Sequence, residues 1–550
     1  MIPMRRAVVS TAFLALLAGT PAFAGDQIRT IDLFTRPQAA QPQEFQSIQL
    51  IAQEWRKLGL DVNVRVMPWE QMSDVVWYQR DNWDATAWQM VGRPERSDPD
   101  EIVFNLFHST TADKGYNFIG YLNPEYDRVV EAERVEIDEA KRKELIDKAQ
   151  EILAADQPNM MLVHPKQTFA FDKTVWDPAS VVEQSGIGIR NTWTFMSLTP
   201  VGEQKDIILN SGDNVQAINP LYISGGVDSW VFELVYDRLV RVGPDGLPKA
   251  WAAESYEWKD DKTIAVTLRE GMKWHDGEPV TPEDVKFSFE TAVSGEAPMY
   301  APFATNIENI AIDGSTITFT LKQPAASFVT SSLAKINLIP KHVWEPIIAD
   351  LKTKEENAES YQEETPIGSG PFRFERWLTN EEIVLSANKD HFNAPKAERW
   401  ILRIVPNVEA ALGMLRSGEI NFLAEFSGDP QVLLQAAEQD GDLETVSTVE
   451  MGFRYVAFNN RRPPFDDPAF RRALSSAVDR RLIVKAAYRG YAEPSNSVVS
   501  PALGFWHNEA VVEGFEAGHD VAVKILEDAG YTLEGDRLHY PGDQKETLAE

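Results

Sequence analysis

Residues 267–289 read TLREGMKWHDGEPVTPEDVKFSF and contain the passage from a strand into a helix. Apolar side chains alternate along residues 264–268, which predicts a strand that ends as this segment begins. Thr281 supplies an N-capping hydroxyl, and Pro282 with the two acids after it suits the first helical turn. The segment therefore predicts a helix that begins at Pro282, in a chain of mixed α/β composition.

Strand and helix patterns alternate on both sides of this segment. Apolar residues recur at helical spacing in residues 44–58, where Gly59 can end the helix, and residues 62–66 alternate as a strand. One long helix is predicted for residues 126–155, with its charged side chains in solvent. The Asp-Gly pair at residues 313–314 joins two alternating runs and predicts a hairpin. We therefore expect an α/β chain with a β-rich middle.

The start of the chain has the features of an export signal. Two arginines precede an apolar run, residues 7–19, and the small residues Ala22 and Ala24 follow it. This pattern is typical of a secretory signal peptide cleaved after Ala24, and the run is too short for a permanent transmembrane helix. The chain contains no cysteine, so neither a disulfide nor a lipid-anchored thiol is expected. We expect a periplasmic protein from which residues 1–24 have been removed.

The composition is that of a folded, acidic protein. The 550 residues carry a formal net charge of -31 at pH 7, and 43% of them are hydrophobic. This length exceeds what a single hydrophobic core supports, so two or three domains are expected. The negative charge disfavours nucleic acid and anionic membranes as partners.

Residues 224–229, SGGVDS, resemble the phosphate-binding loop of ATP pyrophosphatases. Glycines in such a loop let backbone N–H groups approach a phosphate. However, Asn219 and Pro220 interrupt the strand that should lead into the loop, and the periplasm has no supply of ATP. The sequence therefore disfavours a nucleotide site here.

Sequence motifs give little support to catalysis. No two of the eight histidines are four residues apart, and the HExxH and GxSxG motifs of zinc and serine hydrolases are absent. We expect no enzyme activity, no metal site and no cofactor. A secreted glycoside hydrolase with two catalytic carboxylates remains an alternative from another functional class, because acidic residues are abundant.

Several segments resemble landmarks of the extracytoplasmic solute-binding proteins of the peptide/nickel type, family 5, which serve ABC importers. They are residues 234–242, 267–289, 367–377 and 473–484. Residues 525–531, ILEDAGY, resemble the helix that opens the second lobe of these proteins. The segments that should follow it in the family, including residues 51–64 and 105–109, instead lie before residue 200. This order is typical of a circular permutation.

The resemblance implies an α/β fold with two lobes, namely a type II, cluster C-like periplasmic binding protein that is circularly permuted and has an extra β-rich subdomain. The expected parts are a first lobe (residues 166–249 and 363–499, with a joining linker at about 198–206), a second lobe (residues 25–165 and 500–550) and the inserted subdomain (residues 250–362). Permutation is tolerated where chain ends are close together and exposed. It predicts that residues 28–35 lie beside residues 538–550.

The same resemblance implies the periplasmic substrate-binding component of an ABC importer. Such a protein captures an oligopeptide-class solute between its lobes and delivers it to an inner-membrane permease. We expect it to act as a monomer, and an oligosaccharide or an opine remains the alternative ligand. The candidate ligand-binding residues are Trp88, Arg93, Arg96, Asp98, Tyr222, Ser229, Trp230, Phe453 and Trp506.

Residues 88–99, WQMVGRPERSDP, correspond to the ligand loop of the family. Peptide binders of the family commonly place an aspartate soon after the tryptophan, where this chain has Val91. Arg93 and Arg96 could instead hold a carboxylate through paired hydrogen bonds. The alternative is that the arginines form surface ion pairs with neighbouring acids and that Asp98 only shapes a turn.

Residues 222–230 take the place where the family lines the cleft from the first lobe. They predict a flexible binding loop, although their glycines also suit an ordinary turn. The rings of Trp88, Trp230 and Trp506 fit stacking on a sugar or flanking a peptide. Phe453 lies in an alternating run that also suits a buried strand.

Overall fold

The computed structural model describes residues 25–92, 96–222, 226–294, 296–356, 358, 361 and 365–542. The predicted signal peptide and the candidate ligand residue Arg93 lie outside the described residues. Within the described part, no helix has both the length and the apolar character that a membrane span requires.

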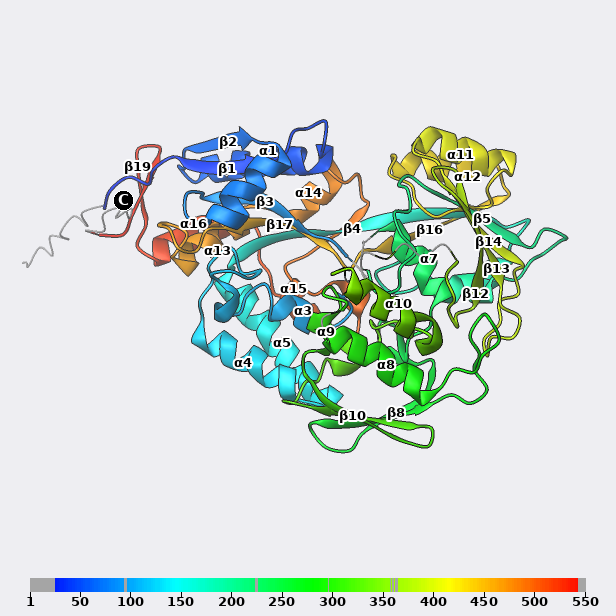
Figure 1. Cartoon of the computed structure of the whole chain (residues 1–550). Helices are drawn as coiled ribbons and strands as arrows, with labels where there is room; N and C mark the ends of the chain where they lie inside the picture. Colours follow the sequence, from blue (N-terminus) through cyan, green and yellow to red (C-terminus); the bar gives the residue numbers. More distant parts are fainter. Residues whose placement is uncertain are drawn as a thin grey trace, which may run out of the picture.

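One large mixed sheet of 12 strands runs through the described part of the molecule (Figure 1). In order across the sheet these are β12 (Phe372–Leu378), β13 (Glu382–Ala387), β14 (Arg399–Ile404), β5 (Asp206–Ser211), β15 (Phe422–Leu423), β4 (Asn159–Asp172), β17 (Phe453–Phe458), β3 (Ala85–Met90), β1 (Ile31–Thr35) and β2 (Val62–Val66), while β16 (Leu443–Val449) and β18 (Ala492–Pro494) also pair with β4. The start of β4 pairs with β17, and its end pairs with β15 and β16. We call the half around β1 the second lobe and the half around β5 the first lobe, so β4 connects the two.

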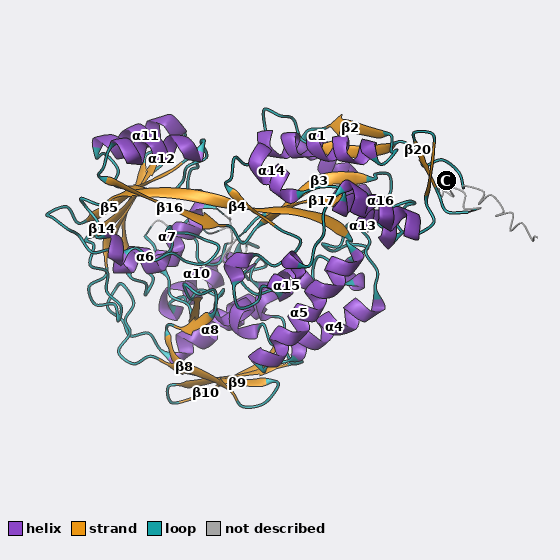
Figure 2. Ribbon diagram, turned by 180° about the vertical axis from the view of Figure 1, so that it is seen from behind, coloured by secondary structure: helices purple, strands orange, loops and turns teal. Residues whose placement is uncertain are grey.

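Helices cover both faces of the second-lobe strands (Figures 1 and 2). They are α1 (Pro42–Lys57), α2 (Trp69–Ser73), α3 (Asp100–Val103), α4 (Pro124–Val135), α5 (Glu139–Asp156), α13 (Pro468–Ser476), α14 (Arg480–Ala486), α15 (Glu509–Glu513) and α16 (His519–Asp528). One core lies between the sheet and α1, α13 and α16, and a second core lies between the sheet and α3, α4 and α5. The buried indole of Trp55 fixes α1 against α13 by donating a hydrogen bond of 3.0 Å to the Leu474 carbonyl. Helices on both faces explain why β3 and β17 are buried on both sides, whereas the edge strand β2 is partly exposed.

The first lobe and the inserted subdomain have separate cores. First-lobe helices are α6 (Thr192–Ser197), α7 (Val227–Val235), α11 (Val408–Ser417) and α12 (Pro430–Gln439). The subdomain contains the hairpin of β6 (Val240–Val242) and β7 (Pro248–Ala250), the sheet of β8 (Ala253–Trp258), β9 (Thr263–Leu268), β10 (Ile307–Asp313) and β11 (Thr316–Leu321), the helices α8 (Pro282–Val293), α9 (Ala301–Ala304) and α10 (Lys341–Thr353), and the π-helix η5 (Val329–Leu333). Trp274, Phe289 and Trp344 are at the centre of its core. Figure 2 shows this subdomain at the edge of the molecule farthest from α1 and α11.

The local predictions around residues 267–289 are confirmed. Helix α8 begins at Pro282 behind a complete capping box, in which the Asp284 amide donates to the Thr281 hydroxyl and the Asp284 carboxylate accepts from the Thr281 amide. The predicted strand is β9, and the predicted hairpin is the β10–β11 pair. Gly314 takes a φ of 60° in its turn, which a glycine adopts without strain.

The prediction of one continuous helix over residues 126–155 was wrong. The structure has two helices, α4 and α5, because Glu136 has an extended backbone and Asp138 caps a new helix by accepting a 3.1 Å bond from the Lys141 amide. Asp138, directly before the first residue of α5, is an N-cap signal that the charge pattern concealed.

The described chain ends lie side by side. The Ile28 amide donates to the Leu538 carbonyl at 2.9 Å, and the Tyr540 amide donates to the Asp26 carbonyl at 3.0 Å, next to the hairpin of β19 (Thr532–Glu534) and β20 (Arg537–His539). Of residues 28–35, however, only the start lies beside this end of the chain. β1 instead pairs in parallel with β2 and β3, because its apolar side chains are buried from both faces of the sheet.

Residues 453–499, which we expected in the first lobe, pack within the second. β17 pairs with β3, and the apolar side chains of α13 and α14, including Phe470 and Ile483, enter the core beneath α1. The physical reason is strand pairing: once β17 joins β3, the helices that follow it can bury their apolar faces only on the same lobe. The chain therefore passes between the two lobes in β4 and in the short connection between β16 and β17.

Candidate functional site

A pocket of about 680 Å³ lies between the two lobes. Its second-lobe wall is formed by residues that follow β1, including residues 41–48 at the start of α1, and its first-lobe wall by residues 424–430, which follow β15. β4 contributes residues to the lining between these walls. Both walls therefore stand at the carboxyl ends of parallel strands, where open α/β sheets bind their ligands. We call this pocket the interlobe cleft.

An ion pair orders the second-lobe wall. Arg36 comes directly after β1, and its guanidinium donates to the Glu44 carboxylate in the first turn of α1, with an Nε to Oε2 distance of 2.9 Å. The Arg36 backbone amide donates to the same carboxylate at 2.9 Å. The Arg36 guanidinium also lies 5.5 Å from the ring centre of the exposed Trp69. This wall is therefore fixed in place before a ligand arrives.

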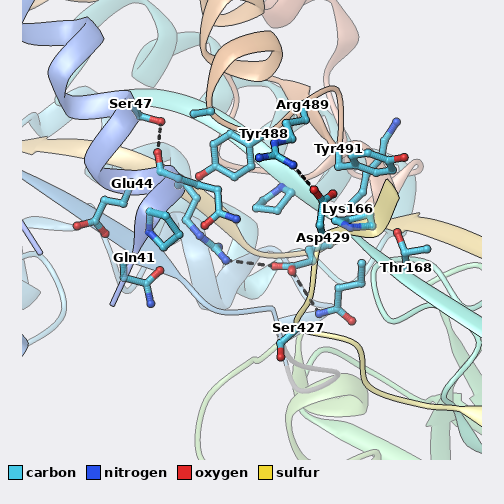
Figure 3. Close-up of a pocket in the computed structure, with 18 of the residues that line it drawn as sticks. Gln41, Glu44, Ser47, Lys166, Thr168, Ser427, Asp429, Tyr488, Arg489 and Tyr491 are labelled. Atoms are coloured by element: carbon cyan, nitrogen blue, oxygen red, sulfur yellow. Dashed lines mark hydrogen bonds and ion pairs between the residues drawn. The ribbon is translucent and has the colours of Figure 1, made fainter. Parts of the chain in front are cut away.

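Figure 3 shows residues of both lobes meeting across the interlobe cleft. Asp429 caps α12 by accepting a 3.1 Å bond from the Gln431 amide, and it forms an ion pair with Arg489 of the second lobe. Burial raises the pKa of the neighbouring Tyr488 to about 12. Its hydroxyl therefore stays protonated at neutral pH and can donate to an acceptor on a ligand.

The first-lobe wall contains Arg190. Its guanidinium carbon lies 3.8 Å from the ring centre of Trp230, and Nη1 donates a 3.2 Å bond to the Ala424 carbonyl. Burial lowers the pKa of Arg190 to about 10, although Glu425 and Glu233 favour its charged form. The side chain is thus a cation at neutral pH, placed over the face of an aromatic ring.

Three aromatic candidates from the sequence lie mainly in the second-lobe core. The Trp88 side chain is 8% exposed, with its ring centre 4.8 Å from that of Trp69, and it reaches the lining of the interlobe cleft. Phe453 is 0% exposed, and Trp506 is 6% exposed with the Arg142 guanidinium 5.1 Å from its ring centre. Phe453 and Trp506 therefore contribute to packing in this conformation.

The candidates around α7 occupy different environments. Trp230 is half-buried and carries Arg190 on its ring, so it supports the cleft wall indirectly. The Ser229 hydroxyl donates a 2.6 Å bond to the Gly226 carbonyl within the first turn of α7. The Tyr222 amide donates to the Asn219 carbonyl. Tyr222 and Ser229 are outside the described lining of the interlobe cleft.

Two candidates from residues 88–99 are tied to the protein itself. Arg96 donates a hydrogen bond to the Val91 carbonyl. Asp98 is buried and forms an ion pair of 2.6 Å with Arg142, while the Thr330 hydroxyl donates a 2.6 Å bond to it. Burial opposes ionisation of Asp98, but the charge of Arg142 and these hydrogen bonds lower its pKa below the ordinary value. Asp98 is therefore an internal anion.

Asp98 belongs to a set of contacts between the second lobe and the inserted subdomain, which we call the clasp. Lys335 forms an ion pair of 2.9 Å with Glu101, and the Ala326 amide donates a 2.7 Å bond to the Arg134 carbonyl. The bond from Thr330 to Asp98 completes the clasp. The clasp thus holds the subdomain, which is inserted in the first lobe, directly against the second lobe.

Comparison with known proteins identifies the family. A family model described as bacterial extracellular solute-binding proteins, family 5 Middle, matches residues 248–549. The chain belongs to this family. The oligopeptide-binding protein AppA of Bacillus subtilis is 28% identical over 333 residues, which are 59% of this chain and 59% of AppA. A putative ABC transporter peptide-binding protein of Brucella ovis is 31% identical over 291 residues, covering 51% of this chain and 52% of that protein.

Among solved structures, the substrate-binding protein CtaP of Listeria monocytogenes matches with 26% identity and a TM-score of 0.49, covering 60% of this chain and 66% of that one. The chain thus spans little more than half the length of the first curated relatives it matches. A family of solute-binding proteins gives no support to the glycoside hydrolase alternative.

The sequence missed most of the charged residues that line the cleft of this family 5 protein. They include Arg36, Glu44, Lys166, Arg190, Glu425, Asp429, Glu450, Arg454 and Arg489. A signal was present for two of them: Arg36 directly follows an alternating run, and Asp429 precedes a proline at a helix start. Charged residues at strand ends are the positions to search in such a fold. Arg190, Arg454 and Arg489 have no comparable local signal.

A buried histidine lies where the lobes connect. The His164 side chain, on β4, is within hydrogen-bond distance of the Gly452 carbonyl at 2.9 Å and of the Ser497 carbonyl at 3.2 Å. It is 0% exposed, and burial lowers its pKa to about 4. The unfolded chain binds a proton at a pKa near 6.5, so acid favours unfolding. The stability linked to neutral His164 is complete above pH 6.5 and is lost as the pH falls towards 4.

We expect the free energy of unfolding to fall by about 2 kcal/mol more between pH 7 and 4.5 in the wild type than in His164→Gln. Urea titrations at both pH values measure the difference. His519→Gln, at an exposed position on α16, is the control and should retain the wild-type slope. An identical pH dependence in wild type and His164→Gln would contradict the role given to His164.

Proposed function

We propose that this protein is the periplasmic substrate-binding component of an ABC importer, and that it captures an oligopeptide-class solute between its lobes for an inner-membrane permease. The observation that carries the proposal is the interlobe cleft, whose walls come from both lobes. A solute held there contacts both walls, and so it stabilises the closed arrangement over an open one. The names of the two curated relatives, both peptide-binding proteins, point to the same class.

The charges in the interlobe cleft favour a peptide. Arginines and carboxylates line both walls, among them Arg190 and Glu425 on the first lobe and Arg36 and Glu44 on the second. A peptide carries an ammonium and a carboxylate group, and its backbone donates and accepts hydrogen bonds along its length. Walls that carry both positive and negative side chains can pair with both charged ends of a peptide and with its backbone polar groups.

An oligosaccharide is the second candidate, and one observation favours it. Trp69 is 41% exposed beside the cleft, and its ring centre lies 4.8 Å from that of Trp88. Exposed indole rings offer flat apolar faces on which sugar rings can stack. The Arg36 guanidinium near Trp69 adds hydrogen-bond donors for hydroxyl groups.

A thermal-shift panel of defined peptides, neutral oligosaccharides and opines tests the function. A ligand that binds only the folded protein at about 100 times its Kd adds about 2.7 kcal/mol to the unfolding free energy, and so raises Tm. We expect the largest shift from peptides of two to five residues. A shift from oligosaccharides alone supports the second candidate. Turnover of a glycoside without any shift would contradict solute binding as the function.

We also propose that the chain is a circular permutation of the family arrangement. The family model begins only at residue 248, while residues 25–247 contribute β1 to β5 of the central sheet. The hydrogen bonds from Ile28 to Leu538 and from Tyr540 to Asp26 bring the two described ends together, as a permutation requires. Residues 201–205, where the original ends would be joined, are exposed between α6 and β5.

Moving the ends back tests this proposal. A variant that joins residue 550 to Gly25 and opens the chain between Gly202 and Glu203 should fold, with a Tm within a few degrees of the wild type. Circular dichroism and thermal unfolding measure the outcome. Opening the chain inside β4, between His164 and Pro165, is the control and should abolish folding because β4 pairs with both lobes. Failure of the Gly202 variant to fold would contradict the permutation.

A further inference from the structure

Arg190 differs from the other cations of the interlobe cleft. Four of the basic side chains in its lining have an acidic partner: Arg36 with Glu44, Lys166 with Glu493, Arg454 with Glu450, and Arg489 with Asp429. Within the described residues, Arg190 forms no ion pair and makes one hydrogen bond, to the Ala424 carbonyl. A guanidinium has five N–H donors, so most of those on Arg190 have no acceptor among the residues that the structure describes.

Two contacts restrain the guanidinium of Arg190. Its Cζ lies 3.8 Å from the ring centre of Trp230, which is the distance of a stacked pair. The bond to Ala424 anchors one edge of the plane to the loop after β15. A guanidinium that is already oriented loses little entropy when it forms two parallel hydrogen bonds.

The nearest acids do not neutralise Arg190 by direct contact. Glu425 and Glu233 favour the charged form of Arg190 through the electric field. The Glu425 carboxylate accepts a 3.1 Å bond from the Gly212 amide, and Glu233 lies 3.6 Å from Arg238. Arg190 therefore stays charged at the cleft, while these two carboxylates contact other groups.

We propose that Arg190, stacked on Trp230, is the site that binds a carboxylate of the solute through two parallel hydrogen bonds. A carboxylate is the planar anion that matches the guanidinium fork, whereas a neutral hydroxyl offers a weaker single acceptor. The inference rests on the proposed function and specifies it further: the solute is an anion at one end. Its carboxylate is the C-terminus of a peptide or the acid group of a sugar.

Matched pairs of solutes test the inference. The probes are tri- to pentaalanine with a free or an amidated C-terminus, and trigalacturonate with the neutral maltotriose. Isothermal titration measures Kd for the wild type, Arg190→Gln and Arg190→Lys. We expect Arg190→Gln to weaken binding of the probe that has a carboxylate by about 30-fold, and that of its partner without a carboxylate by less than about 3-fold. Arg190→Lys should recover part of the loss, because it keeps the charge without the fork.

Arg454→Gln is the matched control, since Arg454 lines the same cleft but is paired with Glu450 at 3.7 Å. It should change the Kd of the probe with a carboxylate and of the probe without one by the same factor. Equal losses for both probes in Arg190→Gln, or no loss, would overturn the carboxylate site while leaving solute binding intact. If no probe binds to the wild type, the proposed function fails together with this inference. Whether alanine peptides or trigalacturonate give the selective loss identifies the source of the carboxylate.

Discussion

Replacing Arg142 with leucine is expected to lower the free energy of unfolding of the second lobe by about 3–5 kcal/mol. Arg142 lies in α5 and is 5% exposed. Its guanidinium holds Asp98 at 2.6 Å and Glu133 at 2.9 Å, and both acidic side chains are buried. Burial already raises the pKa of Glu133 well above its ordinary value. Without Arg142, the buried anion of Asp98 has no countercharge.

Lys148→Leu is the control for this experiment, because Lys148 lies on the same helix in an exposed pair with Glu151. Exposed pairs contribute little, so we expect a change below about 0.5 kcal/mol. Urea unfolding followed by tryptophan fluorescence measures both variants. A loss of less than about 1 kcal/mol in Arg142→Leu would contradict the importance given to the buried ion pair.

Gly368→Ala is expected to destabilise the first lobe by about 3 kcal/mol or more. A Cβ atom at position 368 would lie 1.9 Å from the Val235 carbonyl oxygen, at the end of α7. That oxygen accepts a 2.9 Å bond from the Gly370 amide, so relief of the clash breaks the link between α7 and the start of β12. The motif IGSGPF thus needs its first glycine for a close backbone approach.

Gly413→Ala is the same substitution at a position where we expect it to raise the stability. Gly413 lies inside α11, where a Cβ would have no atom within 4 Å. Alanine has the better helix propensity, so we expect a gain of about 1 kcal/mol. Thermal unfolding of both variants measures the contrast. An equal change of Tm in the two variants would show that the close backbone contact at residue 368 does not cause the destabilisation in Gly368→Ala.

Much of the secondary structure was predictable, because its signals are local. The capping residues at Thr281 and the turn at Gly314 act within a few residues, and both lie where the sequence indicated. Lobe membership was not predictable to the same degree. Residues 453–499 belong to the second lobe only because β17 pairs with β3, which is a contact between residues more than 350 positions apart in the chain. No local pattern specifies such a pairing.

The interlobe cleft was predictable only in outline. The alternating pattern around Phe453 predicts that its side chain is buried in a strand. Which residues face the other lobe, however, depends on how β4 pairs with strands of both lobes. Asp98 lies in the expected loop, yet its partners Arg142 and Thr330 come from a helix and from the subdomain. Contacts between a loop, a helix and the subdomain produce no recognisable spacing along the chain.

Lobe closure on a solute is the central claim, and a distance across the interlobe cleft tests it most directly. The chain has no cysteine, so Gln53→Cys on α1 and Glu438→Cys on α12 provide two unique labelling sites at exposed positions. Spin-label distance measurements give the distribution with and without the peptide that raises Tm the most. The account predicts a broad distribution that becomes shorter and narrower with the peptide. An identical distribution with the peptide bound would contradict closure of the lobes.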